Sequence, residues 1–130
     1  MQTLKLTGIV ADQPNVNGFI YPHNILNKAI NNVRHVIKQR AFLGTIGSDE
    51  PTINNATHLV TELKLENNRV VNTIEILQTK TGQRLSNMLS EMFIPQSNLC
   101  SVAEIEGNVV KDMSIIAVNI MFKASEKETK

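Results

Sequence analysis

Residues 58–78, HLVTELKLENNRVVNTIEILQ, decide the fold. Two strand-like runs, HLVTELKLE and RVVNTIEILQ, flank the pair Asn67-Asn68. Asparagine tolerates the positive φ that a tight hairpin turn requires. The stretch therefore predicts an antiparallel β-hairpin. Because side chains alternate between the two faces of a strand, Glu75 is expected on the face that also carries Val71, Thr73 and Leu77.

A second hairpin is predicted for residues 98–122, NLCSVAEIEGNVVKDMSIIAVNIMF, with its turn at Gly107-Asn108. The same alternation applies to its last strand. We therefore expect one face of that strand to carry Ile116, Val118, Ile120 and Phe122.

Two stretches have helical periodicity. From about residue 22 to residue 39, apolar side chains recur at the three-four spacing of one helix face. Pro22 suits the helix start because its missing N–H needs no partner there. Residues 82–93 repeat the spacing and end before Pro95. The apolar stripe of this second helix consists of Leu85, Met88, Leu89, Met92 and Phe93.

The order of these elements predicts the fold class. A strand over residues 4–11 precedes the first helix, and residues 40–57 are expected to form a long loop. The chain then runs strand, helix, two strands, helix, two strands. This order indicates an α+β fold in which a mainly antiparallel sheet is curved or closed into a small barrel.

Length, composition and charge limit the class of protein. The 130 residues, 42% of them apolar, suit one domain over residues 1–124 followed by a flexible charged tail over residues 125–130. Thirteen basic and twelve acidic residues leave a formal charge of +1, so no direct nucleic-acid partner is expected. No apolar run reaches the roughly 20 residues that span a bilayer, so no membrane contact is expected. A small soluble protein kept inside a cell fits these observations.

The histidines do not predict a metal site. His23 and His35 lie twelve residues apart on one predicted helix, whereas metal ligands on a helix usually lie three or four apart. His58 opens a predicted strand. All three are expected at surface or boundary positions, and we expect neither a metal nor a cofactor.

Cys100 and Ser101 are the candidate nucleophiles, and both lie in a predicted strand. Cys100 is the lone cysteine, which excludes an intrachain disulfide, and a free thiol often packs as a small hydrophobic group. A nucleophile needs a base within hydrogen-bond reach. The spacing of residues alone identifies no such base, and the loop acids Asp49 and Glu50 are expected in solvent.

Three segments resemble the prohead (capsid maturation) proteases of tailed bacteriophages, relatives of the herpesvirus assemblin proteases. Residues 15–30, NVNGFIYPHNILNKAI, are similar to the family's N-x-N-G-R-x-Y-P segment and the helix that follows, with Phe19 in place of arginine. Residues 56–89 resemble its Ser-His strand, hairpin, I-L-x-T-x-x-G turn and short helix. Residues 98–121 resemble its G-V-S-S-R-G strand, a turn, and a strand that ends near an Asp-Ile pair. The resemblance implies the fold of that family.

The matched segments depart from the family where it carries its catalytic residues. The family's base is a histidine in a G-x-x-x-H-P segment, but residues 44–51 read GTIGSDEP. Counting from the glycine puts Ser48 at the histidine position, and counting back from the proline puts Glu50 there. The family's nucleophilic serine falls on Cys100 or Ser101, and Glu75 lies roughly where some members place an acidic third residue.

The resemblance therefore implies an inactive relative. Members of a catalytic triad act as a unit, and loss of the base removes a rate enhancement on the order of 10⁴–10⁶. A carboxylate is a poor base for a serine because its ordinary pKa is near ~4. We expect no catalytic residues, and interpret Ser48, Glu50, Glu75, Cys100 and Ser101 as vestigial positions.

The expected function is that of a non-catalytic virion or capsid-assembly protein with an auxiliary, decoration or cement role. Its partners would be the major capsid protein or other virion proteins, bound through strand edges or asparagine-rich loops. It would be made in the host cytoplasm and kept in the virion in multiple copies. One alternative is an active maturation protease with Cys100 or Ser101 as nucleophile. Another is a small intracellular binding protein unrelated to phage.

Overall fold

The computed structural model describes residues 2–91 and 93–123, so the predicted tail over residues 125–130 and the predicted helical Met92 lie outside the described residues. Within the described residues the chain forms two helices and six strands. In chain order these are β1 (Thr3–Val10), α1 (His23–Lys38), β2 (Leu43–Gly44), β3 (His58–Glu66), β4 (Arg69–Ile76), α2 (Lys80–Leu89), β5 (Ile94–Glu106) and β6 (Val109–Lys123).

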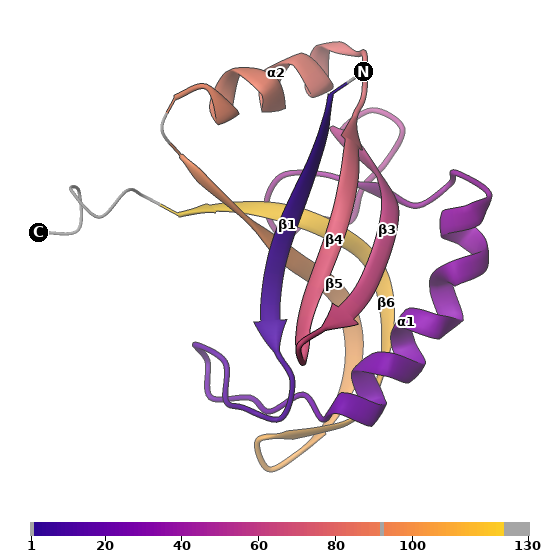
Figure 1. The fold of residues 1–130 in the computed structure, drawn as a ribbon, viewed down its shortest axis with the longest axis vertical. Coiled ribbons are helices and arrows are strands. Elements are labelled where there is room, and N and C mark those ends of the chain that lie inside the picture. The colour runs from indigo at the N-terminus through magenta and orange to yellow at the C-terminus, as the bar shows by residue number, and fades with distance from the viewer. Residues whose placement is uncertain (1, 92, 124–130) are drawn as a thin grey trace, which may run out of the picture.

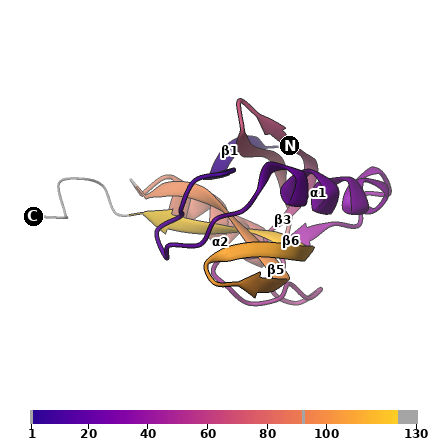
Figure 2. The ribbon, with the colours of Figure 1, turned by 90° about the horizontal axis from the view of Figure 1, so that it is seen from below.

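The strands form two antiparallel sheets that together make a curled half-barrel, as the α+β prediction anticipated (Figure 1). The first sheet has the order β1-β4-β3-β2, and the second is the long β5–β6 hairpin. Figure 2 shows β5 and β6 lying below β1 and β3, with α1 at one flank. A parallel bridge between Ile46 and Ile120 joins the segment after β2 to β6, so the two sheets are linked on that side.

The first hairpin forms as its sequence predicts. β3 and β4 pair from His58 opposite Ile76 to Glu66 opposite Arg69. Asn67 and Asn68 have φ angles of 51° and 63°, which is the left-handed conformation that a tight turn between twisted strands requires. The two asparagines therefore set the register of the central strands.

The core lies between the two sheets and under α1. The buried face of α1 consists of Leu26, Ala29, Ile30 and Val33, at the spacing that predicted the helix. This face packs on β3 and β6. Pro22 lies immediately before the first helical residue, so the predicted start is met within one residue.

Residues 40–57 are not entirely a loop, contrary to the prediction. Leu43 and Gly44 form the short strand β2, which pairs with Leu59 and His58 at the edge of the first sheet. A two-residue strand has no periodicity of its own to recognise in a sequence, because pairing with β3 alone defines it.

The second helix starts and ends earlier than its apolar stripe predicted. α2 begins after Thr79, whose hydroxyl accepts a hydrogen bond from the N–H of Gly82, and it ends at Leu89. Phe93 is therefore outside the helix, and its ring packs edge-on against Phe122 at a centroid distance of 5.8 Å. Pro95 does not terminate the helix but lies near the start of β5, opposite Phe122.

The predicted single face of β6 is wrong at one residue. Cys100 pairs with Ala117 and Ser101 pairs with Ile115, so Ile116 is an extra residue in a β-bulge. The bulge shifts the alternation by one. The core stripe therefore runs from Ile120 and Val118 to Ile115, and Ile116 stays partly exposed.

None of the helices in the described part of the chain is long and apolar enough to cross a bilayer. Within residues 2–91 and 93–123 there is also no group of three or more histidine, cysteine, aspartate or glutamate side chains that could hold a metal ion.

Candidate functional site

Residues 44–51, the segment matched to the base-bearing loop, run along the edge of β6. The N–H of Ile120 donates to the carbonyl oxygen of Thr45 at 3.0 Å. The N–H of Gly47 donates to the carbonyl oxygen of Ile120 at 2.9 Å. The main chain of the segment is thus held as a short parallel strand would be. Its position is fixed by hydrogen bonds rather than left to a mobile loop.

Asn119 is the main side chain that fixes this segment, and it is fully buried. Its Oδ1 accepts from the N–H of Thr45 at 3.0 Å. Its Nδ2 donates to the carbonyl oxygens of Gly47 and Asp49 at 3.2 and 2.8 Å. Asn98 lies directly opposite Asn119 in the hairpin, and its Nδ2 donates to the same Gly47 carbonyl at 3.2 Å. Two amides on one face of the hairpin therefore anchor residues 45–49.

His58 fixes the start of the segment, and it is fully buried rather than at the surface or boundary position that was predicted. Its Nε2 lies 2.9 Å from the carbonyl oxygen of Val118, and its Nδ1 lies 2.7 Å from the hydroxyl of Thr57. A carbonyl only accepts, so Nε2 carries the proton and Nδ1 accepts from Thr57. Burial lowers the pKa of His58 to about 4, although the bond to Val118 acts in the opposite direction. The imidazole is neutral near pH 7.

Gly44 allows this histidine to reach β6. A Cβ atom at residue 44 would collide with Nε2 of His58 and with the carbonyl oxygen of Val118. The absence of a side chain lets the ring cross the main chain at close range. The first glycine of the matched segment therefore has a packing role.

Ser48 and Glu50, the two positions matched to the family's base, are exposed, as is Asp49. The contacts of this part of the segment are made by its main chain, since the carbonyl oxygens of Asp49 and Glu50 accept from Asn119 and Asn55. The side chains of Ser48 and Glu50 are therefore directed to solvent and not to a partner within the described residues.

Cys100 and Ser101 project from opposite faces of β5. Cys100 follows Asn98 by two residues and shares its face, which is the face that residues 47–49 cover. Ser101 shares the other face with Leu99 and Ala103, which pack against the core. Only Cys100 is brought to the side of the segment at 44–51, and its side chain is partly exposed.

Glu75 does not join this group. Its neighbours Ile74 and Ile76 are buried in the core, so by alternation Glu75 points to the outer face of the first sheet. There its carboxylate pairs with the guanidinium of Arg40, just beyond α1. The sheet separates Glu75 from the β5–β6 hairpin.

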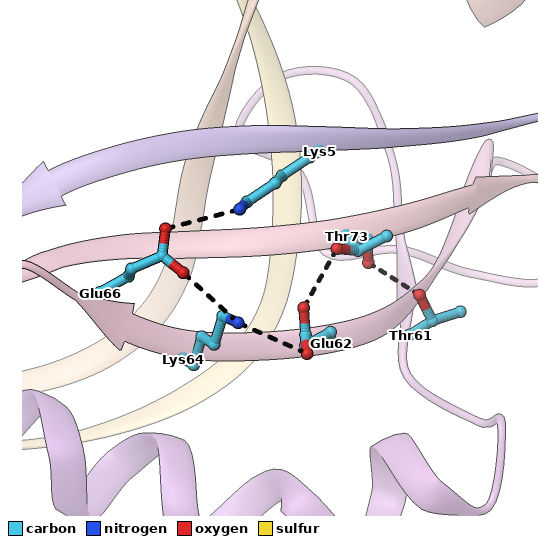
Figure 3. A network of polar contacts seen from close by, with 6 residues as sticks. All are labelled: Lys5, Thr61, Glu62, Lys64, Glu66 and Thr73. Atoms are coloured by element: carbon cyan, nitrogen blue, oxygen red, sulfur yellow. Dashed lines mark hydrogen bonds and ion pairs between the residues drawn. The ribbon is translucent and has the colours of Figure 1, made fainter.

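The outer face that carries Glu75 is a solvated network of charges (Figure 3). Lys64 lies between Glu62 and Glu66 at 3.7 and 3.4 Å, and Lys5 reaches Glu66 at 3.5 Å. The ammonium of Lys5, followed by that of Lys64, holds the pKa of Glu66 below its usual range. Exposed pairs of this kind add little stability, so we assign the face no chemistry.

Within residues 2–91 and 93–123, neither candidate nucleophile is hydrogen-bonded to a possible base. Both ring nitrogens of His58 are already hydrogen-bonded, and His23 and His35 are exposed on α1. Within residues 2–91 and 93–123, no hydrogen bond joins Cys100 or Ser101 to a histidine or a carboxylate.

A groove of about 790 Å³ lies between β1 and β5. Residues 7–10, 13–17 and 96–98 line it, together with Arg69 and Met121. In the described chain β1 pairs only with β4 and β5 only with β6, so each strand has one edge without a strand partner beside the groove, although Arg69 donates to the Gly8 carbonyl oxygen on β1. The groove combines main-chain hydrogen-bonding groups with side-chain amides.

The sequence reasoning missed Asn98, Asn119, the role of His58 and the groove. Asn119 left one signal, because it is a lone amide inside the apolar run IIAVNIMF. A buried amide in such a run needs hydrogen-bond partners from elsewhere in the fold. The sequence does not identify those partners, because they lie about seventy residues away at Thr45, Gly47 and Asp49.

Comparison with solved structures identifies a protein of similar fold. The chain superposes on the capsid assembly protease of bacteriophage T4 with a TM-score of 0.84, over 93% of this chain and 82% of that chain, at 16% sequence identity. No model of a protein family matches the sequence. A search of curated proteins also gives no match. The chain has a prohead-protease-like fold.

Proposed function

We propose that this chain is a non-catalytic capsid-assembly protein of a tailed bacteriophage, in which a protease-like fold serves as a binding module. One observation supports the proposal most. The two candidate nucleophiles are split between the faces of β5, and no described histidine or carboxylate is hydrogen-bonded to either. The segment matched to the base is held along β6 by main-chain hydrogen bonds, but its side chains Ser48 and Glu50 are exposed to solvent.

The partner in this proposal is the major capsid protein or another virion protein, and the chain occupies the particle in multiple copies as an auxiliary, decoration or cement protein. The groove between β1 and β5 is the binding surface. An extended segment of the partner would pair with the free strand edges, since unpaired N–H and C=O groups accept an added strand. The amide of Gln96 would contact its side chains, together with the Nδ2 of Asn15, whose Oδ1 already accepts from Asn17 and Phe19.

One exposed valine at the groove and one exposed isoleucine outside it give a matched test of the groove as a binding surface. Val16 is fully exposed at the groove, and Ile53 is 92% exposed outside it. Val16→Asp is expected to weaken binding to purified capsid protein about tenfold or more, as loss of an apolar anchor does, whereas Ile53→Asp leaves it unchanged. Equal effects of the two substitutions would contradict the assignment of the groove.

The location is tested by mass spectrometry of purified proheads and mature particles. A decoration or cement protein remains in mature particles in a fixed ratio to the capsid protein. Absence of the chain from both kinds of particle would contradict the proposed role.

The second candidate function is a maturation protease that uses Cys100. It is favoured by the placement of Cys100 on the face covered by residues 47–49. Wild-type protein and the Cys100→Ala and Ser101→Ala variants are incubated with capsid and scaffold proteins. Cleavage by the wild type that only Cys100→Ala abolishes would establish the protease and overturn the proposal above. Cleavage that survives both substitutions would exclude this nucleophile.

A further inference from the structure

The outer face of α1 is basic and carries no acidic residue. The sequence holds no aspartate or glutamate between Asp12 and Asp49. The exposed side chains of the helix therefore include no carboxylate, and they are His23, Asn24, Asn27, Lys28, Asn31, Asn32, Arg34, His35 and Lys38. Within the described residues Lys28, Arg34 and Lys38 form no ion pair. At 16 residues the helix extends this face over about 24 Å.

The tip of the β5–β6 hairpin has the opposite character. Glu104 and Asp112 lie directly opposite one another in the register. Like charges in that position destabilise a strand pair unless a cation neutralises them. In the part of the chain that the structure describes, neither carboxylate has an ion-pair partner, since Lys111 pairs with Glu106 instead.

The tip also exposes aliphatic surface. Val102 is 64% exposed beside Glu104, and Ile105 is 45% exposed. The tip is held firmly, because Ile20 exchanges main-chain hydrogen bonds with Asn108 and Val110 at 2.8 and 2.9 Å. A rigid projection that combines unpaired carboxylates with exposed aliphatic side chains has the composition of a protein contact.

The two surfaces match in spacing as well as in charge. Arg34 and Lys38 are four residues apart on α1, and such residues have Cβ atoms about 5–6 Å apart. Directly opposed residues in an antiparallel pair have Cβ atoms about 4.5–5.5 Å apart. The carboxylates of Glu104 and Asp112 can therefore meet two cations of the helix at once.

The two surfaces do not meet within one molecule. The hairpin tip lies next to Ile20, beside the start of α1 (Figure 1), while Arg34 and Lys38 lie in the last turns of the helix and are exposed. We propose that the hairpin tip of one copy docks on the outer face of α1 of a second copy, through ion pairs of Glu104 and Asp112 with Arg34 and Lys38. The contact joins two different surfaces, so it repeats from copy to copy into a ring or an open chain.

Three variants test this contact by sedimentation or light scattering at low salt. The helix variant is K28E/R34E/K38E and the tip variant is E104K/D112K. The control variant K80E/R84E changes exposed charges of α2, away from both surfaces. Wild type and control are expected to self-associate with rising concentration, and each of the other two variants to remain monomeric. Because exposed ion pairs are screened, a rise from about 50 to 500 mM salt should weaken the association about tenfold or more.

The mixture of the helix and tip variants is the decisive measurement. It combines the native tip of the helix variant with the native helix of the tip variant, and the two reversed surfaces are complementary in charge as well, so association that neither variant shows alone is expected to return. A wild type that is monomeric throughout, association that survives in either variant, or a mixture that stays monomeric would each overturn the proposal. The neutral variant K28Q/R34Q/K38Q keeps strong helix formers, so its expected weakening does not depend on helix stability.

Discussion

The Nε2 atom of His58 donates a hydrogen bond to the carbonyl oxygen of Val118 across 2.9 Å, and this bond connects the first sheet to the middle of β6. The ring passes over Gly44 on its way. One buried imidazole therefore fixes the start of the segment that also contains Thr45, Gly47 and Asp49. The bond stabilises the joint between the two sheets of the half-barrel.

Acid is expected to weaken the fold through His58. Its pKa is about 4 in the folded chain against an ordinary 6.5, so between these values the unfolded chain binds more protons than the folded one. The free energy of unfolding therefore falls as the pH falls from about 6.5 to 4, by about 3 kcal/mol in all. Above pH 6.5 this contribution is fully present. Urea unfolding at a series of pH values measures it.

The control for this prediction separates His58 from the other ionisable groups. His58→Gln can still donate to Val118 but does not titrate, so its unfolding free energy should depend less on pH over the same range. Equal slopes for wild type and His58→Gln would refute the assignment.

Gly44→Ala is expected to destabilise the chain by about 3 kcal/mol or more. The new methyl group collides with the imidazole of His58 and the Val118 carbonyl, so strain is added and a buried hydrogen bond is lost. Chemical denaturation measures the change. The same substitution in a His58→Ala background should cost less, because one of the two colliding groups is gone. A cost that is the same in both backgrounds would show that the ring is not the obstacle.

Much of the fold could be predicted because its signals are local. The alternation in β3 and β4 and the pair Asn67-Asn68 define a hairpin within twenty residues of sequence. The apolar stripe of α1 is similarly local. The bulge at Ile116 and the strand β2 could not be predicted, because each is defined by the strand with which it pairs. The end of α2 was predicted too late, because the apolar stripe continues in the sequence beyond the last helical residue.

The candidate site could be predicted only in part. Alternation places Cys100 and Ser101 on opposite faces, but it does not say which face is turned to the core, since apolar residues occur on both faces of the hairpin. The burial of His58 depends on Val118, sixty residues away. Contacts of this kind follow from the packing of the two sheets and leave no pattern in either segment alone.

Asn119→Ala is expected to free residues 45–49 from β6. The substitution leaves the buried N–H of Thr45 without this partner and removes the bonds to the carbonyl oxygens of Gly47 and Asp49, at a cost of about 2–4 kcal/mol. Hydrogen exchange of the amides of residues 45–49 should become faster, while exchange in β3 and β4 should change much less. Asn98→Ala, which removes one bond from a partly exposed side chain, provides the milder comparison. Unchanged exchange at residues 45–49 in Asn119→Ala would show that the main-chain bonds to Ile120 suffice.

Asn72→Leu is expected to stabilise the protein. Asn72 is fully buried on β4 between Leu6 and Leu63, and neither its Oδ1 nor its Nδ2 has a hydrogen-bond partner within the described residues. Burying an amide without partners costs about 1–3 kcal/mol, and leucine of similar size removes that cost. The midpoint of urea unfolding should therefore rise with an unchanged slope. Asn72→Ala separates the cost of the buried amide from the contribution of packing, because it removes the amide but leaves a cavity. Its free energy of unfolding should therefore be lower than that of Asn72→Leu. If Asn72→Leu is less stable than wild type, the amide has a buried partner such as a water molecule, and the expected gain is refuted.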